Sequence, residues 1–169
     1  FHEYSKVEHP DFVLHTERTD LCEFLREYLA GKYDEIDLAG FSLEVSIPER
    51  PVFCALDQLQ FRRVLDNLLS NALRYNRLGT VLFFDISVEE GTAVLRVADN
   101  GAGIPPDRAK YIFEPFVVGR DARSGTGSGL RLSITKRIVE KHGGTVSLSP
   151  RPEPGRSTEF VLRLPLASE

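Results

Sequence analysis

The strongest restriction on the fold comes from two runs of β-branched and aromatic residues, 80–89 and 92–98, separated only by Glu90-Gly91. Runs of strand composition joined by two turn-forming residues predict an antiparallel hairpin. Such a hairpin is too small to stand alone in water. We therefore expect other elements to extend and cover this hairpin.

Those other elements follow from periodicity. Apolar side chains recur at helical spacing over residues 20–38, 57–75 and 130–142, which predicts three amphipathic helices. Thr19 or Asp20 is placed to cap the first, and Gly143-Gly144 ends the third. Strands are expected at 41–47, 52–55, 145–148 and 158–164, and a short helix at 106–113. The inner faces are expected to carry Leu59, Val64, Leu65, Leu68, Ala72 and Leu73 in the second helix, and Leu130, Ile134, Ile138 and Val139 in the third.

The order of these elements, without repeats or an interdomain linker, predicts one domain over residues 1–169. Its fold class is α+β, a two-layer sandwich. Cys22 and Cys54 lie in apolar segments without metal-ligand spacing to histidine, so we expect buried reduced thiols. The chain begins at Phe1 and contains no methionine, which we interpret as a fragment of a longer protein.

Charge and hydropathy narrow the partners. The 21 basic and 25 acidic residues give a net charge of -4, and no segment concentrates Lys and Arg, so nucleic acid is not expected as a partner. The longest apolar run, 81–88, contains Asp85 and is far shorter than the roughly 20 residues of a membrane span. No direct membrane contact is expected from this fragment.

The second helix carries a polar face. Asn67 and Asn71 stand four residues apart in RRVLDNLLSNALRYN and project from the same side. Amide oxygens can ligate Mg²⁺ together with phosphates and waters, although two solvent-exposed asparagines would read the same way. Arg74 can meet a phosphate and Tyr75 can lie against a base, and either can equally be a surface residue.

Two glycine-rich segments follow. DNGAGIP, 99–105, places an acceptor carboxylate before two glycines that allow close approach to the backbone, but ordinary turns look similar. GTGSGLRLSI, 125–134, runs from glycines into a helix, where free N–H groups can cradle a polyphosphate. It is neither a P-loop nor a dinucleotide fingerprint, and a flexible linker is the alternative. Between them, Phe113 and Phe116 of IFEPF are expected to pack into the core, and 117–128 to form a mobile loop.

Together these segments resemble a known family. The order NLLSNALRY, DNGAGIP, IFEPF, GTGSGL and KRIVEKHGG resembles the asparagine, first glycine, phenylalanine and second glycine boxes of the sensor histidine kinases. Their superfamily includes DNA gyrase, mismatch-repair ATPases and a heat-shock chaperone. The resemblance covers about 57–164 and implies a mixed, mostly antiparallel sheet on three helices, the Bergerat-type ATP-binding fold. It also implies that 1–15 is the tail of a preceding linker and 117–128 an ATP lid.

The resemblance implies ATP and Mg²⁺ as ligands. Asn71 would ligate the metal, Asn67 would assist, and Arg74 would meet phosphate oxygens. The residues expected to surround the triphosphate are Gly127, Ser128, Gly129, Leu130 and Arg131.

At the other end of the nucleotide, Tyr75 would contact the adenine and Asp99 would accept its exocyclic amine. Thr158 would support Asp99 directly or through water. The residues implied to shape the adenine pocket are Gly101, Gly103 and Ile104.

The resemblance also implies a reaction. ATP-hydrolysing relatives carry a general-base glutamate where this chain has Asn67, and an amide cannot take a proton at neutral pH, so transfer to a protein side chain is the preferred interpretation. Histidine kinases usually show Gly-Leu-Gly-Leu where this chain reads Gly129-Leu130-Arg131-Leu132. The Arg131 side chain is therefore expected to add charge and to crowd the phosphates or shift the lid. A non-catalytic nucleotide-binding module, and less favoured an ATPase, remain alternatives.

No histidine of the chain has the context of a phosphoacceptor: His2, His9, His15 and His142 all lack a Ser-His-Glu-Leu-Arg-like stretch. The acceptor is expected on a separate helical dimerisation domain of the same protein, and a response regulator as an indirect partner. The implied location is the cytoplasmic portion of a membrane sensor.

Overall fold

The structure is a computed structural model that describes residues 12–115 and 128–168. The expected lid therefore lies outside the described residues except for Ser128, as do Phe116 and most of the expected linker. In chain order the elements are β1 (Glu17–Asp20), α2 (Leu21–Leu38), β2 (Ser42–Ser46), β3 (Phe53–Leu56), α3 (Gln58–Tyr75), β4 (Val81–Glu89), β5 (Thr92–Asp99), α4 (Pro106–Ala109), α5 (Ser128–Lys141), β6 (Thr145–Leu148) and β7 (Thr158–Pro165).

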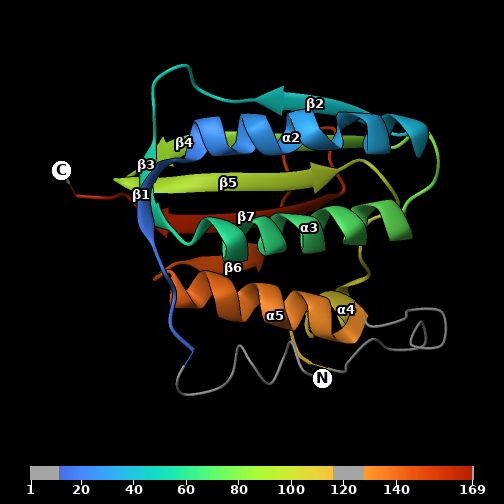
Figure 1. Ribbon diagram of the computed structural model, residues 1–169. Helices are drawn as coiled ribbons and strands as arrows, with labels where there is room; N and C mark the ends of the chain where they lie inside the picture. Colours follow the sequence, from blue (N-terminus) through green and yellow to red (C-terminus); the bar gives the residue numbers. More distant parts are fainter. Residues whose placement is uncertain (1–11, 116–127, 169) are drawn as a thin grey trace.

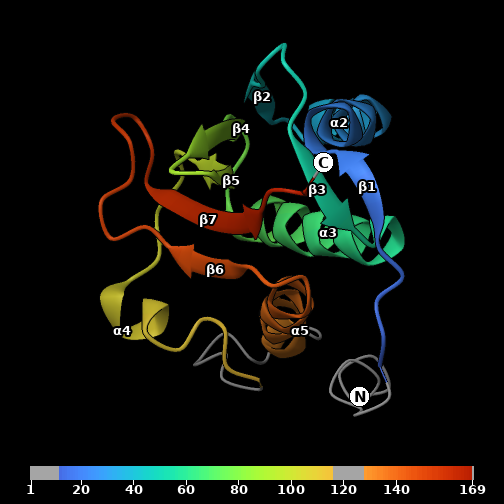
Figure 2. The same ribbon diagram turned by 90° about the vertical axis from the view of Figure 1, so that its left-hand side faces the viewer.

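The elements form two layers. A five-stranded sheet has the order β2-β4-β5-β7-β6, with β2 parallel to β4 and every other pair antiparallel. Helices α2, α3 and α5 lie side by side on one face of this sheet (Figures 1 and 2). This confirms the predicted α+β sandwich of a mixed sheet on three helices.

The hairpin at the centre of the sheet forms as predicted. Glu90 and Gly91 have φ of 52° and 75°, the left-handed pair that a tight two-residue hairpin turn requires. The register runs from Glu89 opposite Thr92 to Leu82 opposite Asp99. Asp99 therefore lies at the carboxyl end of the central strand β5, where the first glycine segment begins.

Strand β1 is the one regular element that the sequence analysis missed among the described residues. It pairs antiparallel with β3, with Thr19 opposite Cys54. Its sequence, ERTD, has no apolar alternation, so only the tertiary pairing reveals it. Asp20 ends the strand and caps α2 by accepting the Cys22 N–H at 3.0 Å. Both cysteines are buried free thiols, as predicted.

Helix α3 buries one face against the sheet and its neighbours. Asp57 caps it by accepting the Gln60 N–H at 3.2 Å. The prediction for Leu59 was wrong: it is 73% exposed, whereas Phe61 is fully buried. Two residues turn a helix by about 200°, so burying Phe61 carries Leu59 to the solvent side. The buried face consists of Phe61, Val64, Leu65, Leu68 and Leu69.

Helix α5 is tied to the start of α3. Gly143 has φ of 81°, and the Gly144 N–H donates to the Val139 carbonyl at 3.1 Å, which closes the helix as predicted. His142 accepts the Asp57 N–H on Nε2 at 3.1 Å and lies 2.8 Å from the Ile138 carbonyl through Nδ1. The ring is thus neutral, with its proton on Nδ1.

Two smaller expectations complete the fold. Helix α4 is shorter than the predicted 106–113, because 110–113 form turns. Phe113 packs against the core with its ring 5.9 Å from that of Phe160, as predicted. None of the helices in the described part of the chain is long and apolar enough to cross a membrane.

Candidate functional site

The C-terminal half of α3 carries four of the predicted site residues, Asn67, Asn71, Arg74 and Tyr75. The two asparagines and Tyr75 are half-buried, and Arg74 is exposed. The apolar face of α3 is anchored in the core, so its polar face is held in one orientation toward α5 and the end of β5.

Asn67 is held by α5. Its side-chain nitrogen lies 3.2 Å from the Arg131 carbonyl and 3.3 Å from the Thr135 hydroxyl. A carbonyl oxygen only accepts, so the group that faces it must be the amide NH₂. Both amide hydrogens are directed at α5, and Oδ1 is the only side-chain atom left to bind a cation.

A polar cavity of about 590 Å³ opens beside this contact, between α2, α3 and α5. Four basic and two acidic side chains line it, so the wall carries an excess of two positive charges. Lys32 and Asp66 lie 3.5 Å apart in an ion pair. This charge suits an anion such as a phosphate group. The lining residues are Lys32, Glu35, Arg63, Asp66, Asn67, Leu69, Ser70, Leu73, Arg74 and Arg131.

Asp99 is the buried acid of the site. It is only 5% exposed, and its Oδ1 accepts the Gly101 N–H at 2.9 Å. Burial raises the pKa of Asp99, although hydrogen bonds from the Gly101 N–H, the Asn76 amide and the Ser157 hydroxyl oppose the rise. A buried carboxylate that is poor in positive partners is well suited to accept a hydrogen bond from a neutral donor.

The backbone around Asp99 depends on two residues that the sequence analysis missed, Asn76 and Ser157. Asn76 donates to the Ala72 carbonyl at 2.8 Å and joins the end of α3 to Asp99. Ser157 donates its N–H to the Asp99 carbonyl at 2.8 Å and its hydroxyl to the Gly101 carbonyl at 2.7 Å. The sequence signal that could have found Asn76 and Ser157 was their position directly beside the predicted Tyr75 and Thr158.

The predicted glycines fit this environment. A Cβ on Gly101 would come within 1.7 Å of Asn76 Oδ1, so no larger residue fits without displacing Asn76. Gly103 has φ of 83°, which disfavours a side chain. Thr158 is buried and lies directly opposite Asp99 in the β5–β7 register, as the prediction of a supporting role requires.

A second cavity, of about 580 Å³, lies between α4 and the β6–β7 strands. We call it the apolar cavity because Ile104, Phe113, Val146 and Leu148 contribute to its wall, together with Thr158. Tyr75 lies close to α4: the centroid of its ring is 5.8 Å from the Arg108 guanidinium. The Tyr75 hydroxyl is buried and has no hydrogen-bond partner in the described part of the chain. Buried hydroxyls rarely lack a hydrogen-bond partner. This fits a hydroxyl whose partner is a bound ligand.

The structure thus gathers the predicted residues in two clusters. Asn67, Arg74 and Arg131 share the polar cavity, and Ile104 and Thr158 share the apolar cavity. Asn71, Tyr75 and Asp99 line neither wall as described, and a continuous pocket joining Asn71 to Asp99 stays a prediction. Helix α3 contributes Asn67 and Arg74 to the polar cavity, and Asn76 at its C-terminal end is hydrogen-bonded to Asp99. Gly127 lies outside the described residues, and Ser128, Gly129 and Leu130 begin α5.

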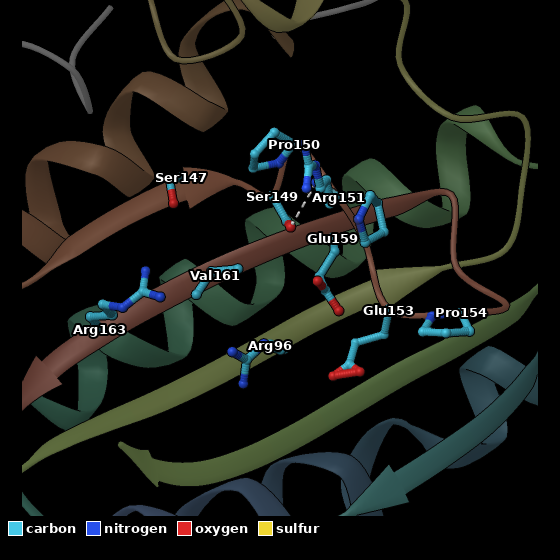
Figure 3. A pocket seen from close by; sticks show the side chains of 11 residues that line it. Arg96, Ser147, Ser149, Pro150, Arg151, Glu153, Pro154, Glu159, Val161 and Arg163 are labelled. Atoms are coloured by element: carbon cyan, nitrogen blue, oxygen red, sulfur yellow. Dashed lines mark hydrogen bonds between the residues drawn. The ribbon is translucent and has the colours of Figure 1, made fainter. Parts of the chain in front are cut away.

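A third hollow, of about 370 Å³, lies on the open face of the sheet away from the helices (Figure 3). Arg96 and Arg163 reach into it. Two of its charged side chains are in ion pairs: Arg96 pairs with Glu89 at 3.0 Å, and Glu159 with Arg156 at 2.8 Å. None of the predicted site residues in the described part of the chain lines this hollow. It adjoins the apolar cavity, with which it shares Ser147, Ser149, Pro150, Pro152 and Glu159.

Comparison with known proteins identifies the family. Residues 56–168 match the family described as histidine kinase-, DNA gyrase B- and HSP90-like ATPase. The sensor histidine kinase YcbM of Bacillus subtilis is 30% identical over 97% of this chain and 53% of its own length. The alginate biosynthesis sensor protein KinB of Pseudomonas aeruginosa is 39% identical over 87% of this chain and 24% of its length.

A solved structure shares the fold. Full-length ShkA, solved in complex with AMPPNP, superimposes with a TM-score of 0.82 at 24% identity, over 99% of this chain and 34% of that one. This chain spans about half of YcbM and a quarter of KinB. The chain therefore belongs to the histidine kinase-, DNA gyrase B- and HSP90-like ATPase family, as the ATP-binding domain of a sensor histidine kinase.

Proposed function

We propose that this domain binds Mg-ATP and presents the γ-phosphate to a histidine on the helical dimerisation and phosphoacceptor domain of the same sensor kinase. A response regulator would then receive the phosphate from that histidine. The domain would work in the cytoplasm as part of a membrane sensor. The proposal draws on the family, on the positively lined polar cavity and on the buried acceptor Asp99.

One observation carries the choice of transfer over hydrolysis. Asn67 occupies the position where hydrolytic relatives carry a general-base glutamate, and its NH₂ group is directed at Arg131 and Thr135. An amide held in this way has no basic atom to activate water. Phosphoryl transfer needs mainly positioning and charge neutralisation when another protein supplies the nucleophile, and this site offers both.

The other residues take roles that follow from their placement. Asn71 and the Oδ1 of Asn67 would hold the magnesium ion, which neutralises phosphate charge when bound. Arg74, on the wall of the polar cavity, would bind phosphate oxygens. Asp99 would accept the adenine amine, and Thr158 would keep the acid in place through the β5–β7 register.

The test combines binding and transfer. The domain is titrated calorimetrically with Mg-ADP, then incubated with labelled ATP and a separately purified phosphoacceptor hairpin. We expect nucleotide binding, label on the hairpin, no stable label on this chain alone and little hydrolysis. Asn71→Ala should abolish transfer, whereas Arg62→Ala, at an exposed position of the same helix, should not. Rapid hydrolysis without the hairpin, or label retained on this chain, would refute the proposal.

A regulatory module that binds nucleotide without transfer is the second candidate. It is favoured by Arg131, which replaces a glycine usual in the kinases and places its guanidinium on Ser70. Nucleotide binding with no label on the hairpin of the same protein would support this alternative.

A further inference from the structure

The side chain of Arg131 extends from the first turn of α5 to the neighbouring helix α3. Its guanidinium donates to the hydroxyl of Ser70 on α3, and both residues form part of the polar cavity wall. A side chain from the first turn of α5 therefore bridges to the neighbouring helix at the position where the kinases usually have a glycine that can make no such contact.

The backbone of Arg131 takes part in the same junction. Its carbonyl accepts from Asn67 at 3.2 Å and from the Thr135 hydroxyl at 3.0 Å. Thr135 is fully buried and also accepts from Asn67 at 3.3 Å. The orientation of the Asn67 amide thus depends on where the first turn of α5 sits, and the side chain of Arg131 fixes that turn to α3.

We propose that Arg131 and Ser70 form a clasp that locks the first turn of α5 against α3 and so aims Oδ1 of Asn67 at the magnesium ion. Arg131 is a positioning residue in this account: its main role is to act through Asn67, and its charge on the wall of the polar cavity contributes less. The inference rests on the proposed function, since it assigns Asn67 a metal-binding role. The clasp explains how a site with arginine in place of one glycine of the second glycine box can keep a defined metal position.

The two ways in which Arg131 could serve the site have different signatures. A clasp supports the metal, so its loss should weaken nucleotide binding only when Mg²⁺ is present. A direct phosphate contact would act with or without the metal, and would not involve Ser70. Two residues that act through one bridge should also be non-additive, because removing either partner removes the same contact.

The test is calorimetric titration with ADP, in excess Mg²⁺ and again in EDTA, on Arg131→Ala, Ser70→Ala and the double variant. We expect each single variant to bind Mg-ADP about ten-fold more weakly, with less than about two-fold change in EDTA, and the double variant to be no weaker than the worse single variant. Ser70→Thr, which keeps the hydroxyl, should bind Mg-ADP as tightly as the unaltered chain does. Lys136→Ala, at an exposed position of α5, is the matched control and should behave as the unaltered chain.

Three results would overturn the clasp: equal losses with and without Mg²⁺, additive losses in the double variant, or full affinity in Ser70→Ala. If the unaltered chain binds no nucleotide, the proposed function fails first. The clasp is then tested separately by urea unfolding of the same four proteins without ligand. Coupled losses of stability for Arg131→Ala and Ser70→Ala would support the bridge, and additive losses would refute it.

Discussion

Replacing Asp99 by asparagine is expected to weaken nucleotide binding without weakening the fold. The carboxylate is buried, and burial raises its pKa despite three hydrogen bonds. The folded protein therefore holds the charged form at a cost, and neutralising it removes that cost. Asparagine keeps an oxygen that can accept the Gly101 N–H, so we expect the free energy of unfolding to rise or to change by less than about 1 kcal/mol.

Binding should respond in the opposite direction. A hydrogen bond to a charged acceptor is worth about 1.5–3 kcal/mol, which corresponds to an affinity loss of roughly ten- to one-hundred-fold. The loss should be specific for the base. A carboxylate accepts from the adenine amine but repels the oxygen that guanine carries there, whereas an amide can donate to it. Asp99→Asn should therefore narrow the preference for Mg-ADP over Mg-GDP.

The pH dependence provides an internal check. Protonation of Asp99 removes its charge, so the affinity of the unaltered chain should fall as the pH falls through the raised pKa, and the asparagine variant should lack this change. The effect on folding has the opposite sign. The folded state binds this proton more tightly than the unfolded chain, so the contribution of Asp99 to stability rises as the pH falls over the same range. The assays are calorimetry with both nucleotides and urea unfolding. Unchanged affinity in Asp99→Asn, or a stability loss above about 3 kcal/mol, would refute this account of the residue.

Three further predictions concern the frame of the site. Gly101→Ala should displace Asn76, whose Oδ1 lies 1.7 Å from the added Cβ position, and urea unfolding should show a loss of about 1–3 kcal/mol together with weaker Mg-ADP binding; a stable variant with full affinity would contradict this. Burial lowers the pKa of His142, so its contribution to stability should be present above about pH 6.5 and lost as the pH falls toward the lowered pKa. Urea unfolding midpoints across this pH range should show the loss of stability, and His142→Gln should make that loss smaller. Phe61→Ala should cost about 3–5 kcal/mol, because the ring is fully buried against Phe24 and His142; a loss below about 1 kcal/mol in chemical denaturation would show that the helix layer is packed differently.

Local signals were enough for most of the fold. The hairpin at Glu90-Gly91, the Asp20 cap of α2 and the glycine end of α5 are each encoded within a few residues, and the structure shows all three. Strand β1 was missed because its polar sequence becomes a strand only by pairing with β3. Leu59 was misplaced because periodicity alone does not decide which side of the first turn faces the core.

The candidate site was less accessible from the sequence. Ser157 acts on Gly101 across 56 residues of sequence, and Asn76 acts through its contact with Asp99, so neither forms a local pattern. The sequence showed only that Arg131 lies in a glycine segment, so its contact with α3 could not be predicted. Its contact with Ser70 joins residues 61 positions apart and depends on the packing of α5 against α3.

In the proposed function the nucleotide lies between the polar cavity and Asp99, with α3 as the common wall. Backbone amide NMR during a titration with Mg-ADP tests this placement. We expect the largest shift changes at Asn71, Tyr75 and residues 99–103, with little change at Arg96 and Arg163 on the open face of the sheet. Shift changes concentrated around Arg96 and Arg163, with residues 71–76 and 99–103 unaffected, would contradict it.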